Sequence, residues 1–229
     1  MTLNIKNQND ILEAFGIDSI YENIPINRVN KEKIFSGKDE MLKNLRNKIL
    51  NIRNCDLKKN SKNIVFGDGN INSYLMIIGE GPGQKEDELG KPFVGEAGLL
   101  LNKMLKAINI NRENVYITNV VNYRPPNNRK PEKNEILKYS EFLKEHISII
   151  NPKIIVLLGS TAMESLLGGK IRISKERGKW KEFILNKKKY KLIISFHPAY
   201  LLRQPDQKKY SWEDLKNLRI EIDKQNIKI

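Results

Sequence analysis

Four short apolar runs alternate along the chain with stretches of helical periodicity, and this alternation constrains the fold more than any other feature. The runs cover residues 74–78, 114–118, 153–159 and 191–196. Helices are expected between them, over about residues 96–108 and 132–150. Strands that are apolar along their whole length are typical of a parallel sheet with both faces covered. The sequence therefore predicts an α/β fold around a central, mainly parallel sheet.

The chain has 229 residues, enough for one such domain with a buried core. We expect the domain to span residues 37–229, and residues 1–36 to form an N-terminal appendage of unknown role. No apolar run approaches the ~20 residues of a membrane-spanning helix, and the N-terminus lacks the pattern of a signal peptide. The sequence predicts a soluble, cytoplasmic protein. The single cysteine, Cys55, excludes an internal disulfide framework and a metal site built from cysteines alone.

The charge balance favours a polyanionic partner. Lys and Arg number 41 against 27 Asp and Glu, which gives a formal net charge of +14. A charge of this sign and size is typical of proteins that bind nucleic acid or an anionic membrane surface. Lys, Asn and Ile are frequent throughout the chain, so part of the excess reflects general composition.

Polar side chains follow each of the four predicted strands. Glu80 comes after the first strand, Asn119 after the second, Gly159 and Ser160 after the third, and His197 after the fourth. Ligands of open parallel sheets bind beyond the carboxyl ends of the strands. We therefore expect these residues to converge on one rim and to form a binding site.

A long connection, residues 79–98, joins the first strand to its helix, and it is rich in glycine and proline. Loops of this length in a compact domain are typically functional. The connection lacks the last glycine of a dinucleotide fingerprint, and the chain has no GK[ST] phosphate loop. A nucleotide-dependent enzyme is thus disfavoured.

Three residues have chemistry that fits a nucleobase. The Asn119 amide offers a donor beside an acceptor, which matches the O4 and N3–H edge of uracil, whereas cytosine presents the reverse pattern. His197 could stabilise negative charge on a departing base, and Phe93 could stack on a planar ring. Each also has a structural interpretation: Asn119 as a turn cap, His197 as a hydrogen-bonding group in the fold, and Phe93 as a core plug.

Taken in order, five segments of the chain resemble the family-4, thermostable-type uracil-DNA glycosylases. They are GEGPGQKEDELGKPFVGEAGLLL, VYITNVVNYRPPNNRKP, IIVLLG, RGKW and HPAYLLRQP. They match in order and spacing across roughly residues 55–220. The resemblance implies a three-layer α/β/α fold with a central four-stranded sheet, and removal of uracil from DNA after base flipping.

The resemblance also implies roles for the residues of the first two segments. Glu80 and Gly81 would shape the uracil pocket and the water site, and Glu86 would lie near C5 of the base, where it excludes a methyl group. Phe93 would stack on uracil, and Asn119 would read its edge.

Two short stretches within these segments supply candidate DNA contacts. Arg124 and Arg129 belong to RPPNNR, and Arg203 to LLRQP; they are expected to bind backbone phosphates. Leu201 or Leu202 would be the wedge that fills the base stack once the nucleotide has flipped out.

One departure from the family is large. The family usually carries an iron–sulfur cluster on four cysteines, and the corresponding positions of this chain hold Ile52, Cys55, Tyr123 and Tyr139. One thiolate cannot hold a cluster that needs four ligands. We therefore predict no cofactor and no metal.

The predicted activity is that of a monofunctional uracil-DNA glycosylase, a base excision repair enzyme that leaves an abasic site. His197 and backbone donors would stabilise the uracil anion, while a water positioned by Glu80 or Glu86 attacks C1′. The expected partner is uracil-containing DNA, double- or single-stranded, bound by a monomer. A degenerate module that binds uracil or single-stranded DNA without turnover is the alternative. A relative that bonds covalently to the abasic site would need an added basic loop beside His197, and HPAYLLRQP shows none.

Overall fold

The structure is a computed structural model that describes residues 31–169 and 172–229, with side chains from residue 37 onward. The chain divides into two units, Met1–Phe35 and Ser36–Ile229, and the second is described below. The predicted appendage at residues 1–36 falls almost wholly outside the described residues, so its role stays a prediction. Among the described helices, none is long and apolar enough to cross a membrane.

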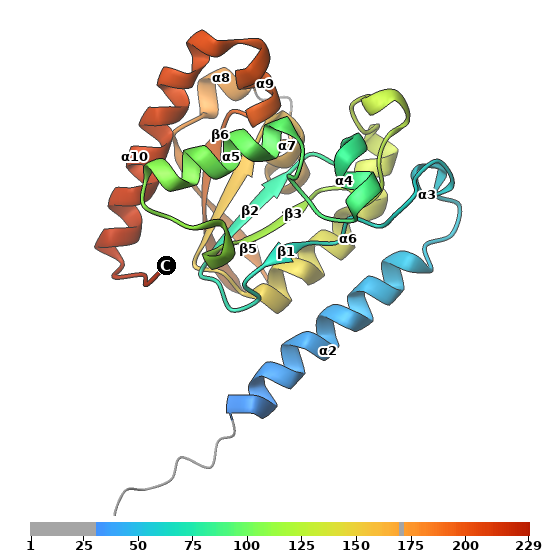
Figure 1. Cartoon of the computed structure of the whole chain (residues 1–229). Helices are drawn as coiled ribbons and strands as arrows, with labels where there is room; N and C mark the ends of the chain where they lie inside the picture. The colour runs from blue at the N-terminus through green and yellow to red at the C-terminus, as the bar shows by residue number, and fades with distance from the viewer. Residues whose placement is uncertain (1–30, 170–171) are drawn as a thin grey trace, which may run out of the picture. The chain divides into compact units, whose positions relative to one another are not determined.

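A six-stranded sheet forms the centre of the second unit (Figure 1). Its strands are β1 (Asp68–Gly69), β2 (Leu75–Gly79), β3 (Tyr116–Asn119), β4 (Ile154–Leu158), β5 (Trp180–Leu185) and β6 (Lys188–Ser195), in the order β1-β3-β2-β4-β6-β5. The inner four strands are parallel, and the edge strands β1 and β5 are antiparallel to their neighbours. The predicted four parallel strands are confirmed, and the sheet extends one strand beyond them on each side.

Helices cover both faces of this sheet, which confirms the three-layer arrangement. One face packs against α2 (Lys31–Leu50, from residue 37), α6 (Lys133–Ile150) and α7 (Ser160–Leu167), and the other against α5 (Glu96–Ala107), α9 (Pro198–Arg203) and α10 (Lys208–Lys224). In β2, Met76 and Ile78 face the first core, while Leu75 and Ile77 face the second. Alternate side chains thus bury in opposite layers, which is why these strands are apolar without interruption.

Shorter helices occupy the connections. They are α3 (Asp56–Lys59), α4 (Gln84–Leu89), α8 (Ile173–Glu176) and the 3₁₀ turns η1 (Arg112–Asn114), η2 (Pro126–Asn128) and η3 (Pro205–Gln207). Helix α4 lies inside the long connection after β2, which the sequence predicted to be loop throughout. It ends at Gly90, whose φ of 68° is a left-handed conformation that glycine adopts without strain.

The strand order places a crevice at the carboxyl ends. Strand β2 lies between β3 and β4, and the chain leaves β2 towards β3 before it crosses back to β4. Connections that diverge in this way from adjacent parallel strands leave an opening between them, and ligands of α/β sheets bind there. The four polar strand ends predicted to converge lie at this rim.

Candidate active site

A pocket of about 950 Å³ opens at the rim and is lined by residues from all four parallel strand ends. Ten residues that the sequence predicted for the site line this pocket: Glu80, Gly81, Glu86, Phe93, Asn119, Arg129, Gly159, Ser160, His197 and Arg203. Its size suits one nucleotide and part of the flanking nucleotides, since pockets for small ligands measure roughly 300–1,000 Å³.

Asn119 ends β3 and presents an unsatisfied acceptor. Its side chain is buried, and its Oδ1 has no hydrogen-bond partner among the described residues. The side chain fits because residue 79 is glycine: a Cβ at Gly79 would lie 2.5 Å from both Asn119 Oδ1 and Phe93 Cζ. A buried acceptor without a partner is costly, of order 1–3 kcal/mol, and such groups in native proteins have a specific cause, such as a catalytic role or a bound water, ion or ligand.

Phe93 forms one wall of the pocket beside Asn119. Its ring is 5% exposed and stacks on His197, with ring centroids 5.5 Å apart and an interplanar angle of 30°. The ring also belongs to the core formed with α5 and α10. Both interpretations of Phe93 therefore describe part of its position, because the residue belongs to the core and also lines the pocket.

His197 is the N-cap of α9, and the cap fixes which nitrogen carries the proton. The Ala199 backbone N–H donates to His197 Nδ1 at 3.2 Å, so in the neutral ring the proton lies on Nε2. Burial, and to a smaller extent the nearby positive charge of Arg203, lower the pKa of His197 to about 4, while Glu86 acts in the opposite direction. His197 at neutral pH is therefore an uncharged ring with one N–H donor.

The Glu80 carboxylate is held by a residue that the sequence analysis did not single out. Thr161 Oγ1, at the start of α7, donates a hydrogen bond to Glu80 Oε2, and Thr161 is fully buried. The interaction joins the end of β2 to the helix that follows β4. The only signal for it in the sequence is the pair Ser160 and Thr161 directly after the third apolar run, since Ser and Thr are typical of helix starts.

Glu86, on α4, is tied to the backbone. Its Oε1 accepts hydrogen bonds from the N–H groups of Val94 at 2.9 Å and Gly95 at 2.7 Å, just before α5 begins. Gly83 leaves room for the other oxygen, since a Cβ there would lie 2.8 Å from Oε2. One carboxylate oxygen of Glu86 thus organises the pocket loop.

The two candidate wedge leucines differ sharply in exposure. Leu201 is 1% exposed and packs in the core, whereas Leu202 is 41% exposed. Successive residues of α9 face different sides of the helix, and this places only Leu202 where a wedge could reach DNA. The prediction of Leu201 is corrected accordingly.

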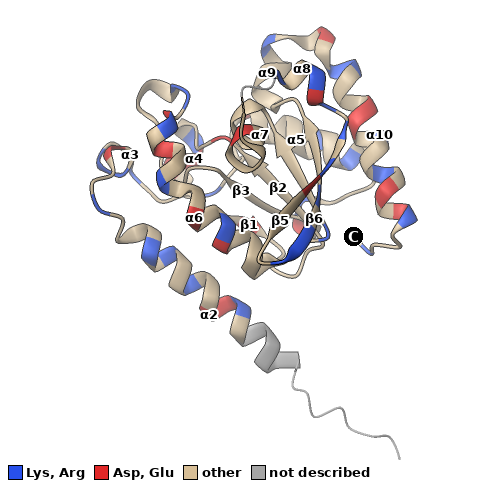
Figure 2. Cartoon of the chain, turned by 180° about the vertical axis from the view of Figure 1, so that it is seen from behind, with Lys and Arg blue, Asp and Glu red and all other residues tan. Residues whose placement is uncertain are grey.

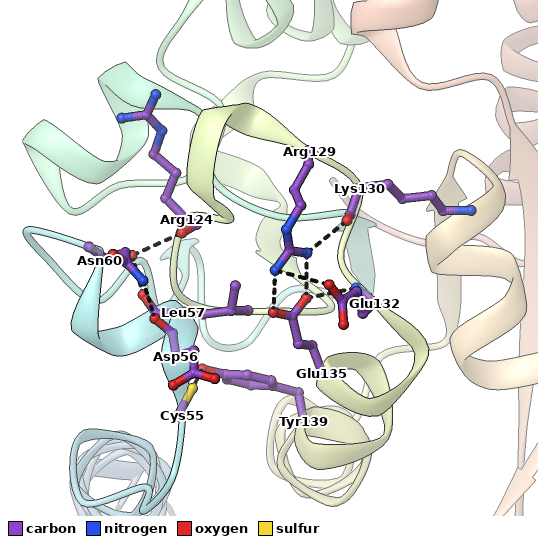
Figure 3. Close-up of polar contacts among 11 residues, drawn as sticks. Cys55, Asp56, Leu57, Asn60, Arg124, Arg129, Lys130, Glu132, Glu135 and Tyr139 are labelled. Carbon is purple, nitrogen blue, oxygen red and sulfur yellow. Dashed lines mark hydrogen bonds and ion pairs between the residues drawn. The ribbon is translucent and has the colours of Figure 1, made fainter.

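The predicted phosphate-binding arginines also differ. Figure 3 shows Arg129 paired with Glu135 on α6; its two terminal nitrogens lie 2.8 and 2.7 Å from the carboxylate oxygens. Arg124 Nε donates to Asn128 Oδ1 at 2.8 Å, and its side chain points away from the Arg129 pair. Arg203 is exposed on α9 at the pocket. The guanidinium of Arg129 is therefore committed largely to shaping its own loop.

Two basic residues of the pocket wall were missed. Lys130 Nζ lies 3.3 Å from Ser160 Oγ and 3.7 Å from a carboxylate oxygen of Glu164, both on α7. Arg172 also lines the pocket. Lys130 belongs to VYITNVVNYRPPNNRKP, where only the two arginines were assigned to DNA, and Arg172 belongs neither to a strand end nor to a matching segment.

Behind the fourth strand end, a buried ion pair supports the chain that leads into His197. Arg177 makes a bidentate contact with Asp214 on α10, which is 2% exposed. Ser195, at the end of β6, donates to Asp214 Oδ2 at 2.7 Å. Gly178 permits this approach, because a Cβ there would lie 2.6 Å from Asp214 Oδ1. The RGKW segment thus anchors the end of β6 from behind.

The four positions that the resemblance assigns to an iron–sulfur cluster are packed with protein. Cys55 Sγ and the Tyr139 hydroxyl are hydrogen-bonded at 3.3 Å, and Tyr139 is fully buried (Figure 3). Burial and the bond to Cys55 raise the pKa of Tyr139. Tyr123 is buried in the same core, and Ile52 packs against its edge. Within residues 31–169 and 172–229, no three His, Cys, Asp or Glu side chains are grouped to hold a metal ion. These residues do not fit a four-thiolate cluster.

Basic side chains are spread well beyond the pocket. Figure 2 shows Lys and Arg along α2, the β5–β6 hairpin and α10 as well as near the rim. Part of this charge is neutralised locally, as in the ion pairs of Lys191 with Glu221 and of Lys189 with Glu182. The net charge therefore supports binding of a polyanion, but the basic side chains are not concentrated on one face that would identify the binding surface.

Comparison with known proteins gives consistent matches. The family model described as the Uracil DNA glycosylase superfamily matches residues 66–218. A Type-4 uracil-DNA glycosylase of Thermotoga maritima is 43% identical over 167 residues, covering 72% of this chain and 85% of that protein. Proteins of the same name from Archaeoglobus fulgidus and Sulfurisphaera tokodaii are 39% and 40% identical over 183 and 187 residues. These two alignments cover 78% and 79% of this chain, and 92% and 84% of the relatives.

Proposed function

Because the chain belongs to the Uracil DNA glycosylase superfamily, we propose that it excises uracil from DNA in base excision repair, hydrolysing the N-glycosidic bond and leaving an abasic site. The observation that carries the proposal is the buried Asn119 Oδ1, which has no hydrogen-bond partner in the described part of the chain and lies in one pocket with Phe93 and with His197. An acceptor for the base edge, a surface for its face and a donor for its departing charge are thus brought together.

Asn119 would select the base. Its Oδ1 would accept the N3–H of uracil, and its amide N–H would donate to O4. Cytosine presents an acceptor at N3 and a donor at C4. With a fixed Asn119, an acceptor would then face an acceptor and a donor would face a donor. A mismatch of this kind costs roughly 1–3 kcal/mol, in addition to leaving Oδ1 buried without a partner.

The cleavage step would use His197 and one carboxylate. The C1′–N1 bond breaks with its electron pair going to uracil, and the Nε2–H of neutral His197 stabilises the charge that develops at O2. A water attacks C1′ and loses a proton, so that deoxyuridine and water give uracil and the abasic sugar. Glu86 uses Oε1 to bind two backbone N–H groups, whereas Thr161 occupies only Oε2 of Glu80. Each carboxylate therefore keeps one oxygen that accepts no hydrogen bond from the described residues, so these contacts leave both Glu80 and Glu86 able to position the water.

DNA would approach the rim with Leu202 as the wedge and with Arg203, Arg124 and Lys130 near the phosphates. Leu202 is exposed on α9, the helix that His197 caps, and from there it could fill the space left by a flipped nucleotide. We propose that the enzyme acts as a monomer on uracil in double- or single-stranded DNA. Unpaired or mismatched uracil should react fastest, because flipping then costs least. The cytoplasmic location expected from the sequence stays a prediction.

The proposal is tested by incubating the purified protein with an end-labelled oligonucleotide that carries one uracil, followed by alkali and gel electrophoresis. We expect cleavage at the uracil position only after alkali, since a monofunctional glycosylase leaves an intact backbone. Matched oligonucleotides with thymine or cytosine at that position should stay uncut. Retarded migration of the uracil oligonucleotide with no excision would instead indicate the alternative, a module that binds without turnover.

We further propose that activity requires no iron–sulfur cluster, because the Cys55–Tyr139 contact and the packing of Tyr123 provide the tie between α3, α6 and the loop after β3. The purified protein should be colourless and should contain far less than one iron per chain by metal analysis. Tyr139→Phe should keep excision per folded molecule while it lowers the melting temperature, since it removes one buried hydrogen bond worth about 1 kcal/mol. A brown protein with about four irons per chain would contradict the assignment.

A further inference from the structure

Phe93, the aromatic wall of the pocket, has a backbone conformation that residues with a side chain rarely adopt. Its φ is +52°, in the left-handed region, although it is not glycine, asparagine or aspartate. Such a conformation persists only where the surroundings over-determine it, and these sites concentrate in functional regions. The question is which residues hold Phe93 in place.

Arg112, in the 3₁₀ turn before β3, holds the backbone at this point. Its Nη1 donates to the Phe93 carbonyl at 2.9 Å, and its Nη2 donates to the Pro92 carbonyl at 2.6 Å. The same two nitrogens are oriented by Asn102 Oδ1 at 3.1 Å, on α5, and by Asp68 Oδ2 at 3.2 Å, on β1. The guanidinium thus joins two successive carbonyls of the pocket loop to two other elements of the domain.

The residues that follow Phe93 are held by a negatively charged carboxylate, that of Glu86. Glu86 Oε1 accepts from the N–H groups of Val94 and Gly95, as described above. A cation therefore binds the two carbonyls at Pro92 and Phe93, and an anion binds the next two N–H groups. Gly98 completes the fit, because a Cβ there would lie 1.9 Å from the Phe93 carbonyl oxygen. The first turn of α5 can approach the loop only without a side chain at that position.

Arg112 does not line the pocket, and its side chain is 21% exposed. It therefore has no position from which to contact a base directly, and any effect on the reaction must pass through the loop. A lysine could supply the charge but not two donors in a fixed plane, which the pair of adjacent carbonyls requires.

We infer that Arg112 is a positioning residue that sets the Phe93 ring for stacking on the flipped uracil. The inference rests on the proposed function, in which Phe93 is the stacking surface. It assigns to Arg112 and its partners Asp68 and Asn102 a role in base selection that the pocket residues alone do not reveal. Misplacing a reacting group by about 1 Å can lower a rate on the order of 100-fold, so the effect should be measurable.

The test is a double-mutant cycle of Arg112→Ala and Phe93→Ala, measured as single-turnover excision of uracil at saturating enzyme and corrected for the folded fraction. We expect Arg112→Ala to slow excision about 10- to 100-fold in the native background, and less than about twofold when Phe93 is already alanine. Arg112→Lys should fall between the native protein and Arg112→Ala. Equal losses in both backgrounds, or no loss in the native one, would overturn the inference.

A second measurement does not depend on activity. Hydrogen exchange of the peptide covering residues 90–99 should be faster in Arg112→Ala than in the native protein, because the loop loses its carbonyl anchors. Arg219→Ala is the matched control, since Arg219 also pairs with an aspartate, Asp223, but lies on α10 outside the pocket lining. Unchanged exchange in Arg112→Ala would refute the positioning role even if the protein excised no uracil. Altered exchange without excision would contradict the proposed function alone.

Discussion

Asn119→Ala should reduce uracil excision below detection, a loss on the order of 1,000-fold or more, while binding to uracil-free DNA stays nearly unchanged. The substitution removes Oδ1, a buried acceptor without a hydrogen-bond partner among the described residues, together with the amide donor beside it. Phosphate contacts supply most of the affinity for DNA, and they lie outside this side chain. The measurements are single-turnover excision and the Kd for an undamaged duplex of the same length.

A neighbouring asparagine provides the control. Asn122 is also buried, but its amide donates to the backbone carbonyls of Val65 and Phe66, so its role is in the fold. Asn122→Ala should lower the melting temperature and keep the rate per folded molecule. Wild-type-like excision by Asn119→Ala would disprove the assignment of the base-reading residue.

His197→Ala should slow cleavage by a factor of about 100–1,000, or roughly 3–4 kcal/mol, and should weaken binding of uracil-containing DNA far less. The reason is that a hydrogen bond to O2 strengthens as negative charge develops on the departing base. His146→Ala is the control, because His146 is buried and bonded through Nε2 to the Tyr116 hydroxyl at 2.8 Å. That variant should melt at lower temperature and cleave normally where folded. If His197→Ala also melts at a lower temperature and cleaves normally where folded, His197 has no catalytic role.

The pH dependence follows from the same residue. Burial lowers the pKa of His197 to about 4 from an ordinary value of 6.5, so the ring stays neutral above about pH 5 and the single-turnover rate should show no transition near pH 6.5. Between about pH 4 and 6.5 the unfolded chain binds more protons at this residue than the folded one. The stability that the neutral ring contributes is therefore complete above pH 6.5 and is lost as the pH falls towards 4. Thermal melts between pH 8 and 4.5 would record the decline, to which His146, with a pKa of about 3, adds.

The parts of this protein that follow from periodicity were predictable, and those that depend on the direction of single side chains were not. Uninterrupted apolar runs can bury in a parallel sheet in few ways, and they placed Glu80, Asn119 and His197 on one rim. The choice between Leu201 and Leu202 depends on the rotation of a six-residue helix, which two adjacent leucines do not specify. The pairing of Arg129 with Glu135 depends on how the loop after β3 meets α6, which the sequence does not reveal.

Arg112 shows a different limit. Its partners are the backbone carbonyls of residues 92 and 93 and two side chains on separate elements, so no local pattern marks it. The short helix α4 was missed for a related reason. Six residues between two glycines are too few to show a helical period, and Glu86 is stabilised there by contacts with the next helix start rather than by local propensity.

The strand order also bears on when the protein becomes active as it folds. The pocket is built from the ends of β2, β3, β4 and β6, and the last of these pairs with β4 only after nearly the whole domain has been synthesised. Parallel pairings of this kind are distant in sequence and form slowly, because each must first close a long loop. A nascent or partly folded chain that contains Asn119 and Phe93 but has not yet docked β6 lacks His197 at the rim. Such an intermediate could hold a base without cleaving it, so cleavage requires that β6 has docked.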